Sequence, residues 1–467
     1  MPVSRSELPI AVIGGGITGL AAAYTIVKSG RTVQLFDSSD RLGGVIRSER
    51  DNGWLSEAGP NSFQENSKEV VALVKELGLE HERVAANPAA KNRYIVREGK
   101  LCALPSSPGS FFATPLFSLR SKARILLEPF MRPRRRPSDV GLADFVADHF
   151  GTEIVDYALN PFVSGIYAGD ATKLSTRHAF PKLWQSEQTK GSLIRGMMAQ
   201  AKQNRAEGHP RSSIISFRGG LQTLTDALAG KIPAGSVELG SRIESLISGN
   251  AWQVVWSRGG ETRTETVGGV VLALPAAAVA RLTFGALAEA PLSTLDTVQY
   301  APVASLFVGF RREQVAHPLN GFGVLIPSRE KRQILGAIFS SSLFPDRAPP
   351  GHVALTVLSG GMLNRSAANG SDEEIVARSL AEIRELLGTS AQPVFQKLTR
   401  WPRAIPQYEL GYERVLDAIR DTERAHPGLV VAGQVRDGIS LPNCLMAGVR
   451  AGEKILQFPS EKSDGSK

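Results

Sequence analysis

The chain has 467 residues, of which 42% are hydrophobic, an ordinary fraction for a soluble globular protein with room for two or three domains. Its net charge is +9, from 54 basic and 45 acidic residues, which is compatible with an anionic membrane or an acidic substrate. Nucleic acid is the weakest option, because no nucleic-acid-binding motif accompanies the charge. The only two cysteines, Cys102 and Cys444, suggest neither a disulfide scaffold nor a cysteine metal site, and they favour a reducing compartment.

The chain begins with a pattern of strand, glycine turn, helix and second strand. Residues 10–13 predict a buried parallel strand, and residues 20–28 predict a helix that Gly30 ends. Residues 32–36 predict the second strand, which finishes on Asp37. The turn between the first strand and the helix consists of Gly14, Gly15, Gly16, Ile17, Thr18 and Gly19.

This order is typical of a dinucleotide-binding site. Gly14 would make the tight turn, Gly16 would let the backbone approach a pyrophosphate, and Gly19 would allow close packing of helix on strand. The pyrophosphate would lie at the helix N-terminus, and Asp37 would accept the ribose hydroxyls. The alternative is that the glycines only punctuate ordinary turns, and it predicts no acid at the end of the strand.

A second glycine pair and several further elements follow. Residues 41–47 contain Gly43 and Gly44, where the backbone could again approach a phosphate. Ser67 is placed to cap a helix that runs to Leu77, and residues 93–96 and 101–104 predict a hairpin. Helices are also predicted over residues 141–149, 153–159, 372–387 and 446–456, with strands over residues 237–239, 252–256, 270–274, 306–310, 334–339, 353–358 and 429–434.

Residues 106–136 combine apolar side chains with basic ones, and Glu128 is the only acid among them. This composition suits the interface of an anionic bilayer, whereas an ordinary solvated helix face usually mixes both signs of charge. The alternative is a buried amphipathic helix with a solvated basic face. Two charge-free stretches, residues 9–27 and 101–119, approach the length of a membrane span, but a glycine turn interrupts the first and three prolines the second. We therefore expect no transmembrane helix.

The sequence resembles the flavin amine oxidase superfamily in residues 10–47 and in its C-terminal strand and helix. Within that superfamily it is similar to the oxygen-dependent protoporphyrinogen oxidase family, from Pro9 to about Gln457. The motifs that carry this closer match are residues 57–63, 92–96, 160–170, 401–408 and 438–444.

The resemblance implies an α/β and α+β fold in three parts. An FAD-binding Rossmann-like domain of the p-hydroxybenzoate hydroxylase type would comprise residues 1–88, 204–290 and 420–459. A mixed-sheet substrate domain would comprise residues 89–105 and 291–419, a helical membrane-binding domain residues 106–203, and a disordered tail residues 460–467. Enzymes of this family are monotopic, which implies a cytoplasmic protein attached to the inner face of the cell membrane.

The resemblance also implies one non-covalent FAD per chain and assigns residues to it. The cofactor-binding residues would be those of the glycine turn (14–19), Asp37, Arg41, Gly43, Gly44, Val45, Gly59, Pro60, Asn61, Ser62, Ile243, Gln434, Ile439, Ser440 and Leu441. For Ile243 and Leu441, core packing is the alternative. The substrate-binding residues would be Arg93, which pairs with a propionate, together with Gly165, Leu335 and Leu358. Asn61 would be the catalytic residue that orients the substrate.

The implied reaction is the six-electron oxidation of protoporphyrinogen IX to protoporphyrin IX by oxygen, in haem synthesis. Hydride transfer to FAD needs alignment more than a strong base, and the sequence offers no His or Cys constellation for nucleophilic or metal catalysis. Alternatives are the same chemistry on coproporphyrinogen III, an amine oxidase, and a non-catalytic membrane flavoprotein. The implied partners are the tetrapyrrole, anionic lipid and ferrochelatase, with no nucleic acid and with monomer and homodimer both open.

Overall fold

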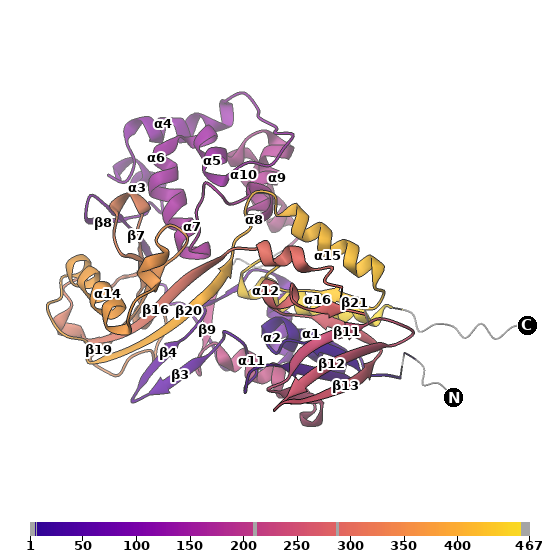
Figure 1. Cartoon of the computed structure of the whole chain (residues 1–467). Helices are drawn as coiled ribbons and strands as arrows, with labels where there is room; N and C mark the ends of the chain where they lie inside the picture. The colour runs from indigo at the N-terminus through magenta and orange to yellow at the C-terminus, as the bar shows by residue number, and fades with distance from the viewer. Residues whose placement is uncertain (1–4, 6, 209–212, 286–288, 459–467) are drawn as a thin grey trace, which may run out of the picture.

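The computed structural model describes residues 5, 7–208, 213–285 and 289–458, so the predicted disordered tail at residues 460–467 lies outside the described residues. Its described strands form five sheets, and helices lie on the sheet faces and beyond one end of them (Figure 1). Within the described part of the chain, every helix is too short or too polar to cross a bilayer.

A parallel sheet with the strand order β10-β2-β1-β14-β21 gathers strands from distant parts of the chain. Its strands are β1 Ile10–Ile13, β2 Val33–Asp37, β10 Val237–Leu239, β14 Gly269–Leu272 and β21 Leu429–Val431. Ile13 lies opposite both Phe36 and Leu272 in this register. The carboxyl ends of the strands therefore share one edge, where parallel sheets bind ligands.

Helices α1 Ile17–Lys28 and α16 Leu441–Leu456 pack side by side next to this sheet. Contacts pair Thr18 with Cys444 and Thr25 with Gly452, so the two helices run parallel and their N-termini lie at the same end. Small residues permit the close approach, because a Cβ added to Gly448 would lie 2.1 Å from the carbonyl oxygen of Thr18.

Both helices begin earlier than the sequence analysis predicted. Helix α1 begins at Ile17 rather than at Leu20, and α16 begins at Leu441 rather than at Met446. The reason in α16 is that the Ser440 side chain caps the helix by accepting from the N–H of Asn443, and that Pro442 is tolerated in a first turn.

A mixed sheet has the strand order β20-β16-β19-β18-β17-β7-β8, and only its β17–β7 pairing is parallel. Its strands are β7 Asn92–Arg97, β8 Lys100–Ala103, β16 Tyr300–Arg311, β17 Gly321–Leu325, β18 Ile334–Ile338, β19 His352–Gly360 and β20 Phe395–Pro406. Helix α14 Asp372–Leu387, predicted with these bounds, packs on one face against Leu355 and Val357. Because side chains alternate along a strand, Thr356 and Leu358 lie on the opposite face.

The other sheets connect to these two. A four-stranded sheet contains β11 Arg242–Ile247, β12 Trp252–Arg258, β13 Glu261–Val267 and β15 Thr283–Phe284. A three-stranded sheet contains β5 Phe63–Glu65, β6 Arg83–Ala85 and β9 Ser213–Phe217, and a hairpin contains β3 Ser48–Asp51 and β4 Trp54–Glu57. Helices α2 Lys68–Glu76, α11 Gln222–Ala229, α12 Ala276–Val279, α13 Ser340–Leu343 and α15 Glu413–Ala425 lie between and around them.

A helical region, residues 106–206, lies at the upper end of the molecule in Figure 1. It contains α3 Pro108–Ala113, α4 Leu119–Leu127, η1 Glu128–Phe130, α5 Leu142–Phe150, α6 Thr152–Ile154, the π-helix η2 Val155–Leu159, α7 Asn160–Tyr167, α8 Thr176–Ala179, α9 Pro181–Lys190 and α10 Leu193–Ala206. The helix predicted over residues 153–159 is thus a short α-turn and a π-turn that continue into α7. The predicted division into domains stays a prediction.

Candidate functional site

The glycine turn after β1 is shaped by close backbone contacts. Gly14 has φ +106°, and a Cβ on it would lie 2.4 Å from the carbonyl oxygen of Ala273. A Cβ on Gly19 would lie 1.7 Å from the carbonyl oxygen of Gly14. Neither position accepts a side chain, so the sequence forces α1 to start directly against the end of β1.

The space beside Gly16 is open by contrast. No atom lies within 4 Å of a Cβ added to Gly16, and Gly16 is the N-cap of α1 without a side chain that caps the helix. The N-terminus of α16 lies at the same end of the helix pair. Helix N-termini attract anions and the N-terminus of α1 has no side-chain cap, so this edge of the parallel sheet can hold a pyrophosphate.

Asp37 lies at the end of β2 with its carboxylate already engaged. Its Oδ2 accepts from the Gly15 N–H at 2.5 Å, and its Oδ1 accepts from the N–H and hydroxyl of Ser39 at 2.8 and 2.5 Å. A carboxylate offers about four acceptor positions, so these bonds fix the side chain and leave capacity for one further donor.

The second glycine loop lies directly against the first. The Gly43 N–H donates to the Gly15 carbonyl at 2.8 Å, and Gly44, with φ +59°, would place a Cβ 3.1 Å from the Cα of Gly16. The Arg41 guanidinium donates to the carbonyls of Leu42 at 2.8 Å and Gly44 at 2.6 Å, which shapes this loop. The Val45 side chain is exposed, at 46%.

The turn at residues 58–62 joins the glycine loop to the mixed sheet. A Cβ on Gly59 would lie 2.2 Å from the Val45 carbonyl oxygen, and the Trp401 indole donates to the Ala58 carbonyl at 2.7 Å. Asn61 accepts from the Thr356 hydroxyl at 3.1 Å and donates to the Gly59 carbonyl at 3.2 Å. Pro60, Asn61 and Ser62 are all partly exposed on this turn.

The remaining predicted cofactor residues lie at the same edge or next to it. Gln434, Ile439 and Ser440 are half-buried in residues 433–440, which we call the C-terminal loop, and Leu441 begins α16 in the core. Strand β11 starts beside Asp37, whose carbonyl accepts from the Ser241 N–H at 2.9 Å. Ile243 lies two residues farther on, half-buried against the core.

Two of the predicted substrate residues come together on the face of the mixed sheet opposite α14. Leu335 and Leu358 are half-buried and pack against one cluster, formed by Ala168, Ala301 and Val303. Leu358 follows Thr356, the partner of Asn61, on the same face of β19. The apolar cluster and the Asn61 turn therefore border the same side of the sheet.

Gly165 and Arg93 lie at the margin of this face. A Cβ on Gly165 would lie 2.7 Å from the Leu325 Cδ2, so α7 touches β17 here. Arg93 pairs with Gly323 of β17, and its exposed guanidinium lies 5.6 Å from the Phe322 ring centre. Among the described residues the Arg93 guanidinium makes no hydrogen bond or ion pair, so it is available to a ligand anion.

A buried ion pair lies behind the Asn61 turn. Arg347 and Glu57, both almost fully buried, approach to 3.4 Å, and a small pocket between them and Asn61 is also lined by Phe307 and Ser340. Burial raises the pKa of Glu57 against the opposing effects of Arg347 and of hydrogen bonds from Ser48 and Leu221, and burial lowers the pKa of Arg347. Burial raises the pKa of Cys444 to about 12 and also raises that of Cys102, which favours the neutral thiol at both positions.

The sequence analysis missed the residues that hold the loops in place. Trp401 and Tyr408 occur in the motif at residues 401–408 but were given no role, and Thr356, Arg347 and Tyr412 carried no signal of their own. The motif at residues 401–408 could have indicated these roles. It contains the indole of Trp401 and the phenol of Tyr408, and both groups usually donate a hydrogen bond when they lie inside a protein.

The residues present fit a dinucleotide of the flavin type. The cradle beside Gly16, which a Cβ would fill, meets the N-termini of α1 and α16, and Asp37 stands at the ribose position of the pattern. The Asn61 turn and the C-terminal loop lie near this edge and are the segments that would contact the rest of the cofactor.

Comparisons with known proteins agree with this geometry. A family model described as flavin containing amine oxidoreductase matches residues 17–456. The chain is 33% identical to the mitochondrial protoporphyrinogen oxidase of Nicotiana tabacum, over 98% of this chain and 96% of that one. It is 30% identical to the coproporphyrinogen III oxidase of Bacillus subtilis (strain 168), over 98% and 99%. A crystal structure of a protein from Exiguobacterium sp. 255-15 matches with a TM-score of 0.80 and 23% identity over 97% of this chain and 99% of that chain, which shows the fold.

Proposed function

Because the chain belongs to the flavin-containing amine oxidoreductase family, we propose that it is an FAD-dependent porphyrinogen oxidase whose substrate is protoporphyrinogen IX. Family membership establishes the mixed α/β fold, with its parallel Rossmann-like sheet and its mixed sheet, and implies FAD as the cofactor. Full-length similarity to protoporphyrinogen oxidases supports the reaction. The exposed Arg93 guanidinium, which has no hydrogen bond or ion pair within the part of the chain that the structure describes, supports an anionic substrate.

The chain's own residues would bind and orient an apolar, anionic tetrapyrrole. Leu335 and Leu358 offer apolar surface for the rings, and the planar Arg93 guanidinium can hold a propionate with two parallel charge-assisted bonds. Asn61 is fixed by Thr356 and Gly59, so it can orient the reacting methylene bridge. When bound, FAD would supply hydride acceptance and reoxidation by oxygen. Three rounds would complete the six-electron oxidation, with three molecules of hydrogen peroxide formed.

The membrane surface is a proposed partner. Exposed apolar side chains gather on the helical region, with Leu119 exposed at 81% and Phe130 at 85%, and others at Phe112, Leu126, Leu127, Phe162, Ile166, Met197 and Met198. Arg120, Arg132 and Arg135 are exposed among them. Apolar residues beside cations suit an anionic bilayer, which would deliver a poorly soluble substrate. We propose peripheral attachment to the inner face of the cell membrane, with ferrochelatase as a candidate recipient of the product.

Coproporphyrinogen III is the second candidate substrate, since the chain is similar to a coproporphyrinogen III oxidase over nearly its whole length. The test is an aerobic assay of the FAD-loaded protein with both porphyrinogens in parallel, following porphyrin fluorescence. A preference for protoporphyrinogen IX is expected. A preference for coproporphyrinogen III would keep the proposed cofactor and mechanism but change the substrate. If neither porphyrinogen were oxidised, an amine oxidase or a non-catalytic flavoprotein would be favoured.

Arg93→Ala tests the substrate contact. We expect KM to rise about tenfold or more while FAD binding is unchanged, because a charge-assisted bond to the substrate is lost. Lys100→Ala, which removes an exposed cation from the same hairpin, is the control and should leave KM unchanged. Equal kinetics for Arg93→Ala and wild type would contradict the assignment.

A further inference from the structure

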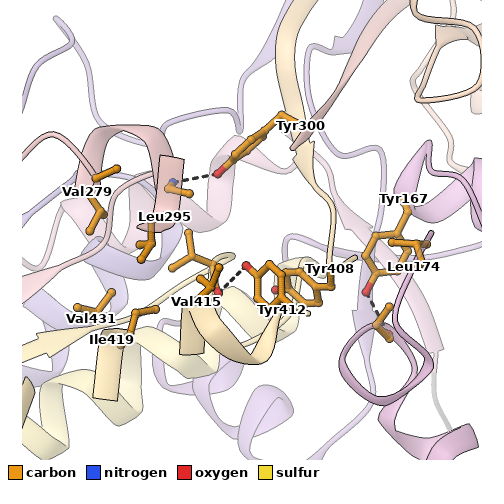
Figure 2. Packing of buried hydrophobic residues seen from close by; sticks show 14 of the residues in the cluster. Tyr167, Leu174, Val279, Leu295, Tyr300, Tyr408, Tyr412, Val415, Ile419 and Val431 are labelled. Atoms are coloured by element: carbon orange, nitrogen blue, oxygen red, sulfur yellow. Dashed lines mark hydrogen bonds between the residues drawn. The ribbon is translucent and has the colours of Figure 1, made fainter. Parts of the chain in front are cut away.

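Four buried tyrosines, Tyr167, Tyr300, Tyr408 and Tyr412, surround the segment that leaves the mixed sheet (Figure 2). Tyr408 and Tyr412 follow β20, and their rings lie 4.5 Å apart between centres. Tyr167, at the end of α7, packs edge-on to Tyr408 at 6.2 Å. Each hydroxyl has a defined backbone partner, so the group is an arrangement of specific bonds as well as an apolar cluster.

The Tyr408 hydroxyl closes the C-terminal loop. It donates to the carbonyl of Gln434 and accepts from the N–H of Gly438 at 3.1 Å. The neighbouring Tyr412 hydroxyl donates to the Val435 carbonyl at 2.8 Å, as Figure 2 shows. A single buried hydroxyl thus fixes both ends of a five-residue stretch, and a second hydroxyl fixes a carbonyl within it. Burial raises the pKa of both phenols, which therefore stay neutral donors.

The segment that carries Tyr408 is itself held from two other sides. The Ser175 N–H donates to the Tyr408 carbonyl at 2.8 Å, and the Leu410 N–H donates to the Lys173 carbonyl at 2.9 Å. The buried Gln407 side chain donates to the carbonyls of Tyr167 at 2.9 Å and Ile405 at 3.0 Å. Ile405 packs in the cluster that contains Leu335 and Leu358. One segment therefore links α7, the C-terminal loop and the side of the mixed sheet that carries Leu335 and Leu358, which we call the substrate face.

We propose that Tyr408 is a positioning residue that pre-organises the C-terminal loop for the flavin and fixes that loop relative to the substrate face. The proposal rests on the family's cofactor and not on the identity of the porphyrinogen. Because the bonds that close the loop come from the protein's own Tyr408, FAD would bind with a smaller entropic cost of ordering the loop. Removing the hydroxyl leaves the half-buried Gln434 carbonyl and Gly438 N–H without this partner, which frees the loop to leave its binding conformation.

Tyr408→Phe tests this role, because it keeps the ring packing and removes only the two hydrogen bonds. Tyr300→Phe is the matched control from the same cluster, because its hydroxyl accepts from the Ala276 N–H at 2.9 Å, outside the C-terminal loop (Figure 2). Both variants should lose comparable thermal stability as apoproteins. The dissociation constant of FAD, titrated by flavin fluorescence well below the melting temperature, should rise about tenfold in Tyr408→Phe and stay at the wild-type value in Tyr300→Phe.

The visible circular dichroism of bound flavin gives a second readout that a merely structural role would not move. We expect an altered flavin band in FAD-saturated Tyr408→Phe and a wild-type band in Tyr300→Phe. Wild-type FAD affinity and a wild-type band in Tyr408→Phe would overturn the proposal, and so would equal weakening of FAD binding by Tyr300→Phe. Because neither measurement uses a porphyrinogen, a failed substrate assignment cannot be mistaken for a failure of this proposal.

Discussion

The cofactor edge and the helical region are held together in opposite ways. At the cofactor edge, elements meet because side chains are absent, at Gly14, Gly19 and Gly448. In the helical region, elements meet through buried charged side chains. The His149 ring lies between Glu128 at 2.8 Å and Glu187 at 2.9 Å, and both carboxylates are almost fully buried.

Glu128, His149 and Glu187 form one network with Arg136 and Asp148, which we call the charged cluster. The network connects several helices of the helical region. Glu128, in η1, also accepts from the Ser192 hydroxyl at 2.7 Å and from the Leu193 N–H at 2.8 Å, so it caps α10. Arg136 contacts both Glu187 at 3.2 Å and Asp148 at 2.7 Å. The comparison teaches that the packed glycines of the cofactor edge are sensitive to an added side-chain atom, whereas the interior of the helical region is sensitive to the loss of a charged group.

The largest effect should follow from Gly19→Ala. The added Cβ would lie 1.7 Å from the Gly14 carbonyl oxygen, which is backbone and cannot move without displacing β1 or α1. Overpacking of this kind costs about 3 kcal/mol or more of unfolding free energy. The measurement is chemical denaturation of the apoprotein.

Gly16→Ala is the matched control for that variant. Gly16 has φ −73° and no atom within 4 Å of the added Cβ, so the apoprotein should lose less than about 1 kcal/mol, the cost of alanine at an N-cap. Its FAD binding should nevertheless fail, because the Cβ fills the pyrophosphate cradle. If both variants were equally stable, the distinction between a packed and an open glycine would be wrong.

The cofactor edge was predictable because its signal is local. Gly14, Gly16, Gly19 and Asp37 lie within one strand–helix–strand unit, and the structure places them at one edge of the parallel sheet. The start of α16 was missed, because a proline in the first turn resembles a loop signal until the Ser440 cap is seen. Arg93, Gly165, Leu335 and Leu358 were named only through the resemblance.

The charged cluster could not be predicted from the sequence, for a physical reason. Glu128 and Glu187 are 59 positions apart, and nothing in the residues around either one marks it as buried. Their burial depends on how several helices pack together. The basic residues of 106–136 were predicted to face an anionic bilayer, yet Lys122 is buried and donates to the carbonyls of Phe112 and Thr114, both at 2.8 Å, inside the region.

Glu128→Ala should have the next largest effect. The substitution leaves the buried His149 with one carboxylate fewer and removes the acceptor of the Leu193 and Ile194 N–H groups in the first turn of α10, so we expect a loss of about 3 kcal/mol of unfolding free energy. Arg134→Ala, which breaks an exposed ion pair to Asp148 in the same region, is the control and should cost less than about 1 kcal/mol. A Glu128→Ala protein as stable as Arg134→Ala would contradict the structural role of the cluster.

The difference in unfolding free energy between wild type and Glu128→Ala should depend on pH. Burial alone would raise the pKa of Glu128, but the hydrogen bonds from Ser192, Leu193, His149 and Ile194 outweigh it and lower the pKa. A carboxyl whose pKa is lower in the folded state stabilises the fold fully above its unfolded pKa of about 4.3. The stability gap between wild type and Glu128→Ala should therefore shrink as pH falls below about 4.

Substitutions on the outside of the helical region should have the smallest effect on unfolding free energy. They should nevertheless weaken binding to anionic vesicles. Leu119→Ser and Phe130→Ser change side chains that are 81% and 85% exposed, so unfolding free energies should move by less than about 0.5 kcal/mol. Burying such a side chain in a bilayer interface contributes about 1 kcal/mol or more, so the double variant should bind anionic vesicles at least tenfold more weakly in a sedimentation assay. Val394→Ser, at a side chain 50% exposed beside β20, should bind vesicles like wild type. If wild type, the double variant and Val394→Ser bound vesicles equally, Leu119 and Phe130 would not form the membrane contact. These substitutions leave the interior of the helical region unchanged, so the test concerns its outer apolar surface alone.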